Sequence, residues 1–293
     1  MRHPYATIAL ILLAGCQQPA DVELTPDEDQ STLEVRSVVV PDTNLSLGSI
    51  DTLAVLPEDQ MSFKAHFLVH RITTDAAAGR NVLAYARVFF ADSSVRWLGQ
   101  TVGFDGKSLG SVVLNGVPMT QIAHRIPIST SVLTARDTSI IRGVEYVADL
   151  TGSYLPAKGY VWSYNPAVTG LPSQSVRTPD ALTVLSPLGG TVIARDRDLL
   201  LRWVGTSGRI SIVLSVFEPL TKRVRPLLEL RPVTNTGKAV LPAKLLESLP
   251  RLKRYYVFTF ILANRSGADI TQPLSGKVLA QAADVYNSFV EIR

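Results

Sequence analysis

From Ser49 onward, turn residues interrupt the chain about every 8–12 positions, and the stretches between them are short apolar runs. Asp105-Gly106 and Asn115-Gly116 favour the positive φ angles of tight turns between strands. This spacing is typical of sandwiches and barrels, so the sequence predicts an all-β fold. The strands expected in the first half are Ile50–Leu56, Phe63–Ile72, Val82–Phe90, Val95–Val102, Ser111–Val117, Gln121–Ile128, Ser139–Leu150 and Tyr160–Tyr164.

The length of 293 residues allows about two domains of 100–200 residues each. Arg177-Thr178-Pro179-Asp180 marks a junction, which places one β-sandwich domain at 46–178 and a second at 179–293. In the second region Leu199, Leu201 and Trp203 alternate onto one face of a strand, as in a half-buried sheet. One short helix is predicted at Pro242–Leu249, between two prolines.

The second region resembles the immunoglobulin-like and fibronectin type III domains of bacterial surface proteins. The resemblance lies in the opening Ser186-Pro187-Leu188-Gly189-Gly190, a strand that ends in Trp203, and the late strand Tyr255–Leu262. It implies a sandwich of about seven strands, without the cysteine pair of antibody domains. In the first region, Gly143-x-x-Tyr146 resembles the tyrosine corner of such folds, in which a phenol ties a turn to a strand.

The first sixteen residues resemble the leader of bacterial lipoproteins. A basic start is followed by the apolar run Tyr5–Leu13, which is too short to span a bilayer, and then by Leu13-Ala14-Gly15-Cys16. The resemblance to the lipobox implies that residues 1–15 are removed and that Cys16 is lipidated, which anchors the protein to a membrane. Gln17 stands where an aspartate would indicate inner-membrane retention, so the outer membrane is the expected address.

An acidic segment follows Cys16. Between Gln17 and Val35 there are six acidic residues and no basic one. Such a composition buries too little apolar surface to order itself, so residues 16–45 are predicted to form a flexible tether with a reach of about 30 Å. The acids also resemble the surface-export signals of some outer-membrane lipoproteins, and both interpretations stay open.

No catalytic or metal-binding pattern in the sequence has the context that its chemistry needs. Gly106-Lys107-Ser108-Leu109-Gly110 matches G-x-S-x-G, but a strand follows it where a nucleophile elbow needs a helix, so a hairpin loop is predicted. His66 and His70 share one strand face about 13 Å apart, too far for one metal ion, and are expected to be half-exposed. Asp196-Arg197-Asp198 lacks the later ligands of a calcium loop. We therefore expect no enzyme activity, metal or cofactor.

Two groups of residues are candidates for binding. Tyr160, Trp162 and Tyr164 alternate on one strand and form either a stacking platform for sugar rings or the inner face of that strand. Basic residues cluster in the second region and either attract an anionic glycan or an acidic protein, or belong to solvated loops. The candidates among them are Arg223, Arg225, Lys253 and Arg254.

The sequence thus predicts a lipid-anchored protein of the cell envelope with a non-catalytic role in binding, adhesion or scaffolding. The alternative is a carbohydrate-binding module that uses the row Tyr160-Trp162-Tyr164. An enzyme whose site has no sequence signature is a third class. The expected partners are the membrane, through Cys16, and an envelope protein or anionic glycan, while nucleic acid is not expected for an exported lipoprotein.

Overall fold

A computed structural model describes residues 33–37, 63–97, 99–129, 137–165, 173–218, 223–251, 255–270 and 276–293, all of which belong to one compact unit, Ser31–Arg293. Nearly all elements in these ranges are strands, which confirms the all-β fold class. The single helix there, α3 (Ala243–Ser248), lies within the predicted one. No helix in the described ranges is long and apolar enough to cross a membrane. The strand predicted at Ile50–Leu56 lies outside these residues.

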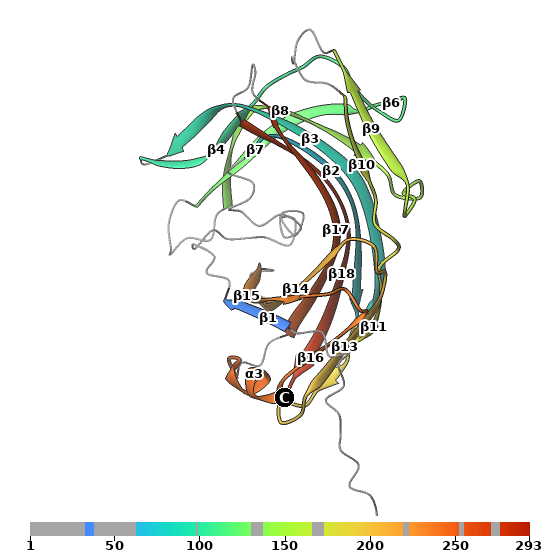
Figure 1. The fold of residues 1–293 in the computed structure, drawn as a ribbon. Coiled ribbons are helices and arrows are strands. Elements are labelled where there is room, and N and C mark those ends of the chain that lie inside the picture. Colours follow the sequence, from blue (N-terminus) through green and yellow to red (C-terminus); the bar gives the residue numbers. More distant parts are fainter. Residues whose placement is uncertain are drawn as a thin grey trace, which may run out of the picture. The chain divides into compact units, whose positions relative to one another are not determined.

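One large sheet of eleven strands dominates the fold, and its long central strands bend together (Figure 1). Its order is β1-β15-β14-β17-β18-β2-β3-β4-β8-β7, and β12 also pairs with β18. The strands are β1 (Leu33–Ser37), β2 (Phe63–Ala76), β3 (Gly79–Trp97), β4 (Gln100–Gly106), β7 (Thr120–Ser129), β8 (Asp137–Asp149), β12 (Val192–Ile193), β14 (Arg209–Glu218), β15 (Arg223–Pro232), β17 (Tyr255–Ile270) and β18 (Gly276–Ile292).

Two small sheets pack on one face of this large sheet, which we call the outer face. The first has the order β10-β9-β5-β6 and consists of β5 (Val112–Leu114), β6 (Val117–Pro118), β9 (Gly159–Tyr164) and β10 (Gln174–Arg177). The second has the order β11-β13-β16 and consists of β11 (Thr183–Ser186), β13 (Leu199–Val204) and β16 (Lys238–Leu241). The opposite face of the large sheet is the inner face. Successive residues of a strand alternate between the two faces.

Each small sheet closes its own apolar core against the outer face. Phe67 of β2 belongs to the core beneath β9 and β5, and Phe258 of β17 belongs to the core beneath β11, β13 and β16. β18 contributes to both, because Ala282 lies in the first core and Val290 in the second. The large sheet therefore acts as a common layer for two sandwich-like halves.

The predicted tandem of two separate sandwiches is not confirmed, because the large sheet crosses the boundary expected at 178/179. β18 pairs in parallel with β2 from Lys277↔Phe63 to Ser288↔Asp75. The two halves recognised in the sequence correspond to the two cores, but they share one hydrogen-bonded layer.

The segment 16–45, predicted to be a flexible tether throughout, contains a strand. β1 pairs antiparallel with β15 from Leu33↔Pro232 to Ser37↔Leu228. Leu33 also packs against the core that contains Phe258. Leu33, Val35 and Ser37 alternate with the charged residues Glu34 and Arg36, a pattern that suits an edge strand. This stretch has one acid and one base, whereas the charged residues that precede it in the segment are all acidic.

Candidate functional site

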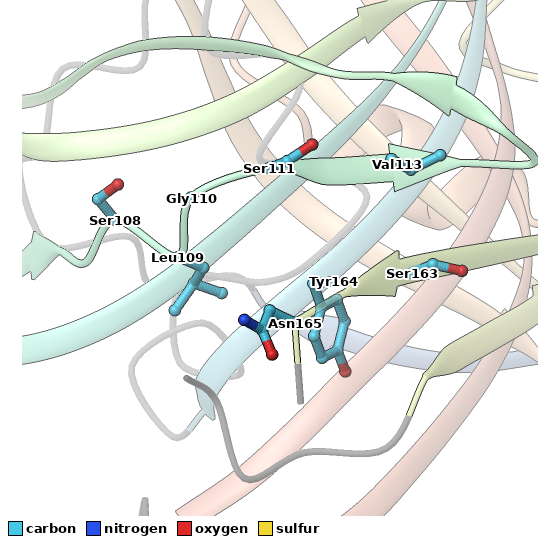
Figure 2. Close-up of a pocket in the computed structure, with 8 residues that line it drawn as sticks. All are labelled: Ser108, Leu109, Gly110, Ser111, Val113, Ser163, Tyr164 and Asn165. Atoms are coloured by element: carbon cyan, nitrogen blue, oxygen red, sulfur yellow. The ribbon is translucent and has the colours of Figure 1, made fainter. Parts of the chain in front are cut away.

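An open hollow lies beside the first small sheet, where the chain entering β5 passes the end of β9 (Figure 2). Its volume is about 560 Å³. The register of the two strands brings its walls together, because Val112 pairs with Tyr164 and Val113 pairs with Ser163. The hollow is lined by Ser108, Leu109, Gly110, Ser111, Val113, Ser163, Tyr164 and Asn165.

The loop that forms one wall of the hollow is held in place by the core beneath it. The side chain of Leu109 is buried among the residues packed on Phe67. The backbone N–H of Leu109 donates to the phenol oxygen of Tyr146 at 2.8 Å, and the N–H of Lys107 donates to the carbonyl of Phe90 at 2.8 Å. The wall is therefore a fixed surface, with its apolar side chain turned inward.

The lining of the hollow is largely apolar surface with hydroxyl and amide groups on it, and it carries no charged side chain. Ser108, Ser111 and Ser163 contribute hydroxyls, Asn165 an amide and Tyr164 a phenol. Burial raises the pKa of Tyr164 to about 12, so its phenol stays neutral across the physiological range. Hydroxyls and amides donate and accept hydrogen bonds, so this arrangement suits a neutral molecule rich in hydroxyl groups.

Ser108 of the G-x-S-x-G stretch lies in the wall of the hollow, but its surroundings are not those of a nucleophile. It sits in the loop between β4 and β5, as a loop was predicted, although these strands belong to different sheets and form no hairpin. Its hydroxyl lies 3.4 Å from the phenol oxygen of Tyr146 and 3.4 Å from Oε1 of Gln121. Neither group is a general base of the kind that activates serine.

The aromatic row on β9 points into the core. Tyr160 is 4% exposed and Trp162 is 0% exposed, whereas their neighbour Val161 is 43% exposed. The Trp162 ring lies 5.4 Å from that of Phe67, centroid to centroid. Only Tyr164, at the end of the row, reaches the hollow, so the three rings do not form an exposed platform.

The two histidines of β2 are buried on the inner face, so the expectation that they are half-exposed is wrong. His66 is 8% exposed and His70 is 0% exposed. Nδ1 of His70 lies 3.1 Å from the phenol oxygen of Tyr85 on β3. Burial, together with the positive charges of Arg87 and Arg265, lowers the pKa of His70 to about 3, so this imidazole is neutral at neutral pH.

Next to them, an acid and two basic side chains form a small network on β3, β7 and β8. Glu145 Oε2 accepts from Arg87 at 2.6 Å and lies 3.0 Å from Nδ1 of His124. Burial by itself would raise the pKa of Glu145, but the hydrogen bond with His124 and the charge of Arg87 outweigh it and lower the pKa. No group of three or more His, Cys, Asp or Glu side chains in the described ranges is placed to hold a metal ion.

The predicted basic cluster is only partly described. Arg223 and Arg225 begin β15, and the side chain of Arg225 is exposed. Lys253 and Arg254 lie outside the described residues, as does Cys16. Phe217 of β14 pairs on one side with Val224, which lies between Arg223 and Arg225, and on the other side with Tyr255.

Asp198 of the acidic stretch 196–198 has a structural role. Its carboxylate accepts from the backbone N–H of Ala243, the first residue of α3, at 2.8 Å. Asp196 beside it is exposed.

Sequence reasoning did not single out the hollow as a site. Its two walls are about fifty residues apart in the chain, and only the pairing of β5 with β9 brings Ser111 near Ser163. The network of Arg87, Glu145 and His124 was missed for the same reason. Arg87 and Glu145 meet only through the pairing of β3 with β8. No local signal marks either arrangement.

No protein-family model matches this sequence, and no curated protein matches it. Among solved structures, one similar chain is the yeast delta-COP-I mu-homology domain. It is 8% identical, the match covers 78% of this chain and 98% of that domain, and the TM-score is 0.24.

Proposed function

We propose that this chain is a lipid-anchored protein of the cell envelope, attached through Cys16, with a non-catalytic binding role centred on the hollow. The proposed address is the outer membrane, because Gln17 follows the cysteine. The observation that carries the anchor is the stretch Leu13-Ala14-Gly15-Cys16, which ends a short apolar run and contains the only cysteine of the chain. More than one acyl chain on this cysteine would give the stable attachment that a single chain does not.

The observation that carries the binding role is the uncharged, hydroxyl-rich lining of the hollow. Three serine residues, Asn165 and Tyr164, whose phenol stays neutral, are among the residues that line it. An aromatic ring beside hydroxyl and amide groups is a common way to hold a sugar, since the ring contacts its apolar face and the polar groups contact its hydroxyls. The proposed ligand is therefore a neutral glycan. This version of the carbohydrate-binding alternative uses Tyr164 but neither Tyr160 nor Trp162, which lie in the core.

A Cys16→Ser variant tests the anchor. The unaltered protein should enter the detergent phase on phase separation and incorporate labelled palmitate, whereas the variant should stay in the aqueous phase without label. Thr7→Ser, which alters a residue of the proposed leader but leaves Cys16 in place, is the matched control and should behave like the unaltered protein. An unaltered protein that carries no acyl group would refute the anchor.

A Ser163→Arg variant tests the binding role, because an arginine at this position fills the hollow and adds a charge. Binding to neutral oligosaccharides on an array should fall at least ~10-fold relative to the unaltered protein. Val117→Arg is the control, since Val117 is 63% exposed on β6 of the same small sheet and does not line the hollow. Equal binding by both variants, or no binding by the unaltered protein, would refute a glycan site in the hollow.

A further inference from the structure

The second small sheet, β11-β13-β16, exposes aliphatic side chains on the face that points away from the core. Leu201 and Trp203 of β13 point inward and are 0% and 3% exposed. On the opposite face, Leu200 is 45% exposed, Val204 is 54% exposed, and Leu185 of β11 is 45% exposed. Large apolar side chains that are exposed together on one sheet face mark an interaction surface, whereas single exposed ones do not.

Two basic side chains lie in the middle of this face. Arg202 of β13 is directly opposite Lys238 of β16, and the bulge of β11 at Leu185 lies on the other side of Arg202. None of the described residues that the strand register places on this face is acidic. Like charges in directly opposite positions weaken strand pairing, and negative charge outside the sheet reduces that cost.

These residues together form a surface that we call the basic-apolar patch. Its members are Leu185, Leu200, Arg202, Val204 and Lys238. The patch offers positive charge and aliphatic surface side by side, so a partner that suits it combines negative charge with an apolar layer. An anionic bilayer has both, with phosphates at its surface and acyl chains beneath them.

We infer that the basic-apolar patch docks on a membrane surface that contains anionic lipids. The aliphatic side chains enter the boundary between headgroups and acyl chains, while Arg202 and Lys238 reach the lipid phosphates. Long basic side chains suit this position, because their methylene groups lie along apolar surface and their charges stay at the headgroups. Residues 179–293 contain sixteen basic and nine acidic residues, so the field of this half attracts it to the same surface.

The composition of the patch favours a bilayer over a protein as the occupant. Tryptophan, tyrosine and arginine dominate the binding energy of protein interfaces, whereas leucine and valine are under-represented and lysine is depleted. The patch has three aliphatic residues, a lysine and no aromatic residue. A two-fold contact of the patch with a second copy would bring the basic pairs Arg202–Lys238 of both copies together, which like-charge repulsion disfavours.

This docking goes beyond the proposed lipid anchor and does not depend on it. A protein held at a membrane through Cys16 meets the bilayer at a high effective concentration, so even a weak patch is enough to orient it. A protein without lipid on Cys16 would bind through the patch alone. The tests therefore use full-length Cys16→Ser protein, in which failure of the patch is a separate result from failure of the anchor.

Vesicle sedimentation measures the contribution of the two basic side chains. Cys16→Ser protein should bind vesicles of phosphatidylglycerol and phosphatidylethanolamine more tightly than vesicles of phosphatidylcholine alone. In this background, Arg202→Gln/Lys238→Gln should lower the affinity for the phosphatidylglycerol vesicles about 25-fold, since each basic residue at an anionic surface contributes about a 5-fold factor. High salt should weaken the binding of the parent protein as well.

The matched control removes the same charge from the first small sheet. Lys158 and Arg177 are both exposed, and Arg177 pairs with Gly159, the neighbour of Lys158. Lys158→Gln/Arg177→Gln should bind the vesicles like its Cys16→Ser parent. Equal losses in the two double variants would overturn the inference, because net charge alone would explain the binding. Equal binding of both vesicle types would also overturn it, as would a dimer that binds no vesicles, which would assign the patch to a second copy.

A polarity-sensitive fluorophore on a single cysteine provides a second test, of the aliphatic side chains. Cys16 is the only cysteine, so Leu200→Cys in the Cys16→Ser background places one label in the patch. Val161→Cys is the control, since Val161 is 43% exposed on the outward side of β9. Phosphatidylglycerol vesicles should shift the emission to shorter wavelength for the label at 200 and leave it unchanged at 161. A shift at both positions or at neither would overturn the inference.

Discussion

Arg71 on β2 and Asp284 on β18 form a buried ion pair across the parallel junction of the large sheet. Nε of Arg71 donates to Oδ1 of Asp284 at 2.9 Å, and the backbone N–H of Leu182 donates to Oδ2 at 2.8 Å. Burial raises the pKa of Asp284 despite the opposing effect of Arg71. The free-energy cost of desolvating the carboxylate therefore exceeds the stabilisation that Arg71 gives to its charge, as is common for buried pairs.

Removing only the arginine from this pair should be strongly destabilising. We expect Arg71→Met to lower the free energy of unfolding by about 3–5 kcal/mol, because the carboxylate of Asp284 stays buried without its counter-charge. The double variant Arg71→Met/Asp284→Asn should regain at least half of the loss, since asparagine is neutral and still accepts from Leu182. Urea unfolding measures both. Equal stability of the single variant and the unaltered protein would contradict this account.

His70 should make the fold sensitive to acid. Its pKa is about 3 in the folded state and about 6.5 when unfolded, so between these values the unfolded chain binds the extra proton. The contribution of His70 is fully present above pH 6.5 and is lost as the pH falls toward 3. Between pH 7 and pH 4.5 this amounts to about 2–3 kcal/mol.

The measurement is urea unfolding at both pH values for the unaltered protein and for His70→Gln, which does not titrate. The variant should lose about 2–3 kcal/mol less than the unaltered protein on acidification. The difference between the two proteins isolates His70 from His66 and His124, which both retain. An identical loss would show that His70 is not the acid-sensitive group.

Gly143 should tolerate no side chain. It pairs with Gly106 where β8 meets β4, its φ is +76°, and a Cβ atom there would lie 1.9 Å from the carbonyl oxygen of Gly106. Gly143→Ala should therefore separate the two strands and yield a protein that unfolds at clearly lower urea or does not accumulate. Gly116→Ala is the control, because its φ is also positive but a Cβ there meets nothing within 4 Å. That change should cost only about 1–2 kcal/mol of backbone strain.

Tyr146 should control the order of the hollow's wall. Tyr146→Phe removes the acceptor of the Leu109 N–H, and a buried amide without a partner costs about 1–3 kcal/mol. The amide of Leu109 should exchange faster in this variant, and any ligand affinity of the hollow should fall with it. Tyr255→Phe, at a side chain that is 53% exposed, should change neither property. Unchanged exchange at Leu109 would show that the phenol is dispensable.

The sequence predicted those features that depend on local patterns. Turn residues marked most strand ends, and the prolines around 242–250 located α3. One local prediction was wrong: the sequence placed a break between the strands Val82–Phe90 and Val95–Val102, whereas β3 continues through Asp92, Ser93 and Ser94 as a bulged strand. The hydroxyl of Ser93 donates to Asp105 across the bulge at 2.9 Å, which accommodates polar residues inside a strand.

Features that depend on strand pairing could not be predicted in this way. Alternation shows that Phe67 and His66 point to opposite faces, but not what covers either face. The burial of His66 and His70 follows from the inner face being covered. The hollow follows from the pairing of β5 with β9, and the shared sheet follows from the parallel pairing of β18 with β2. Two partial cores can be recognised in a sequence without any sign that one strand completes both.

The position of β18 has a consequence for the order of events during synthesis. Ala282 and Val290 of this strand complete the two cores, and its neighbours β2 and β17 have no other link between them in the sheet. The halves can collapse only loosely until Gly276–Ile292 have left the ribosome. Until then the apolar faces of both halves stay incompletely covered in the nascent chain.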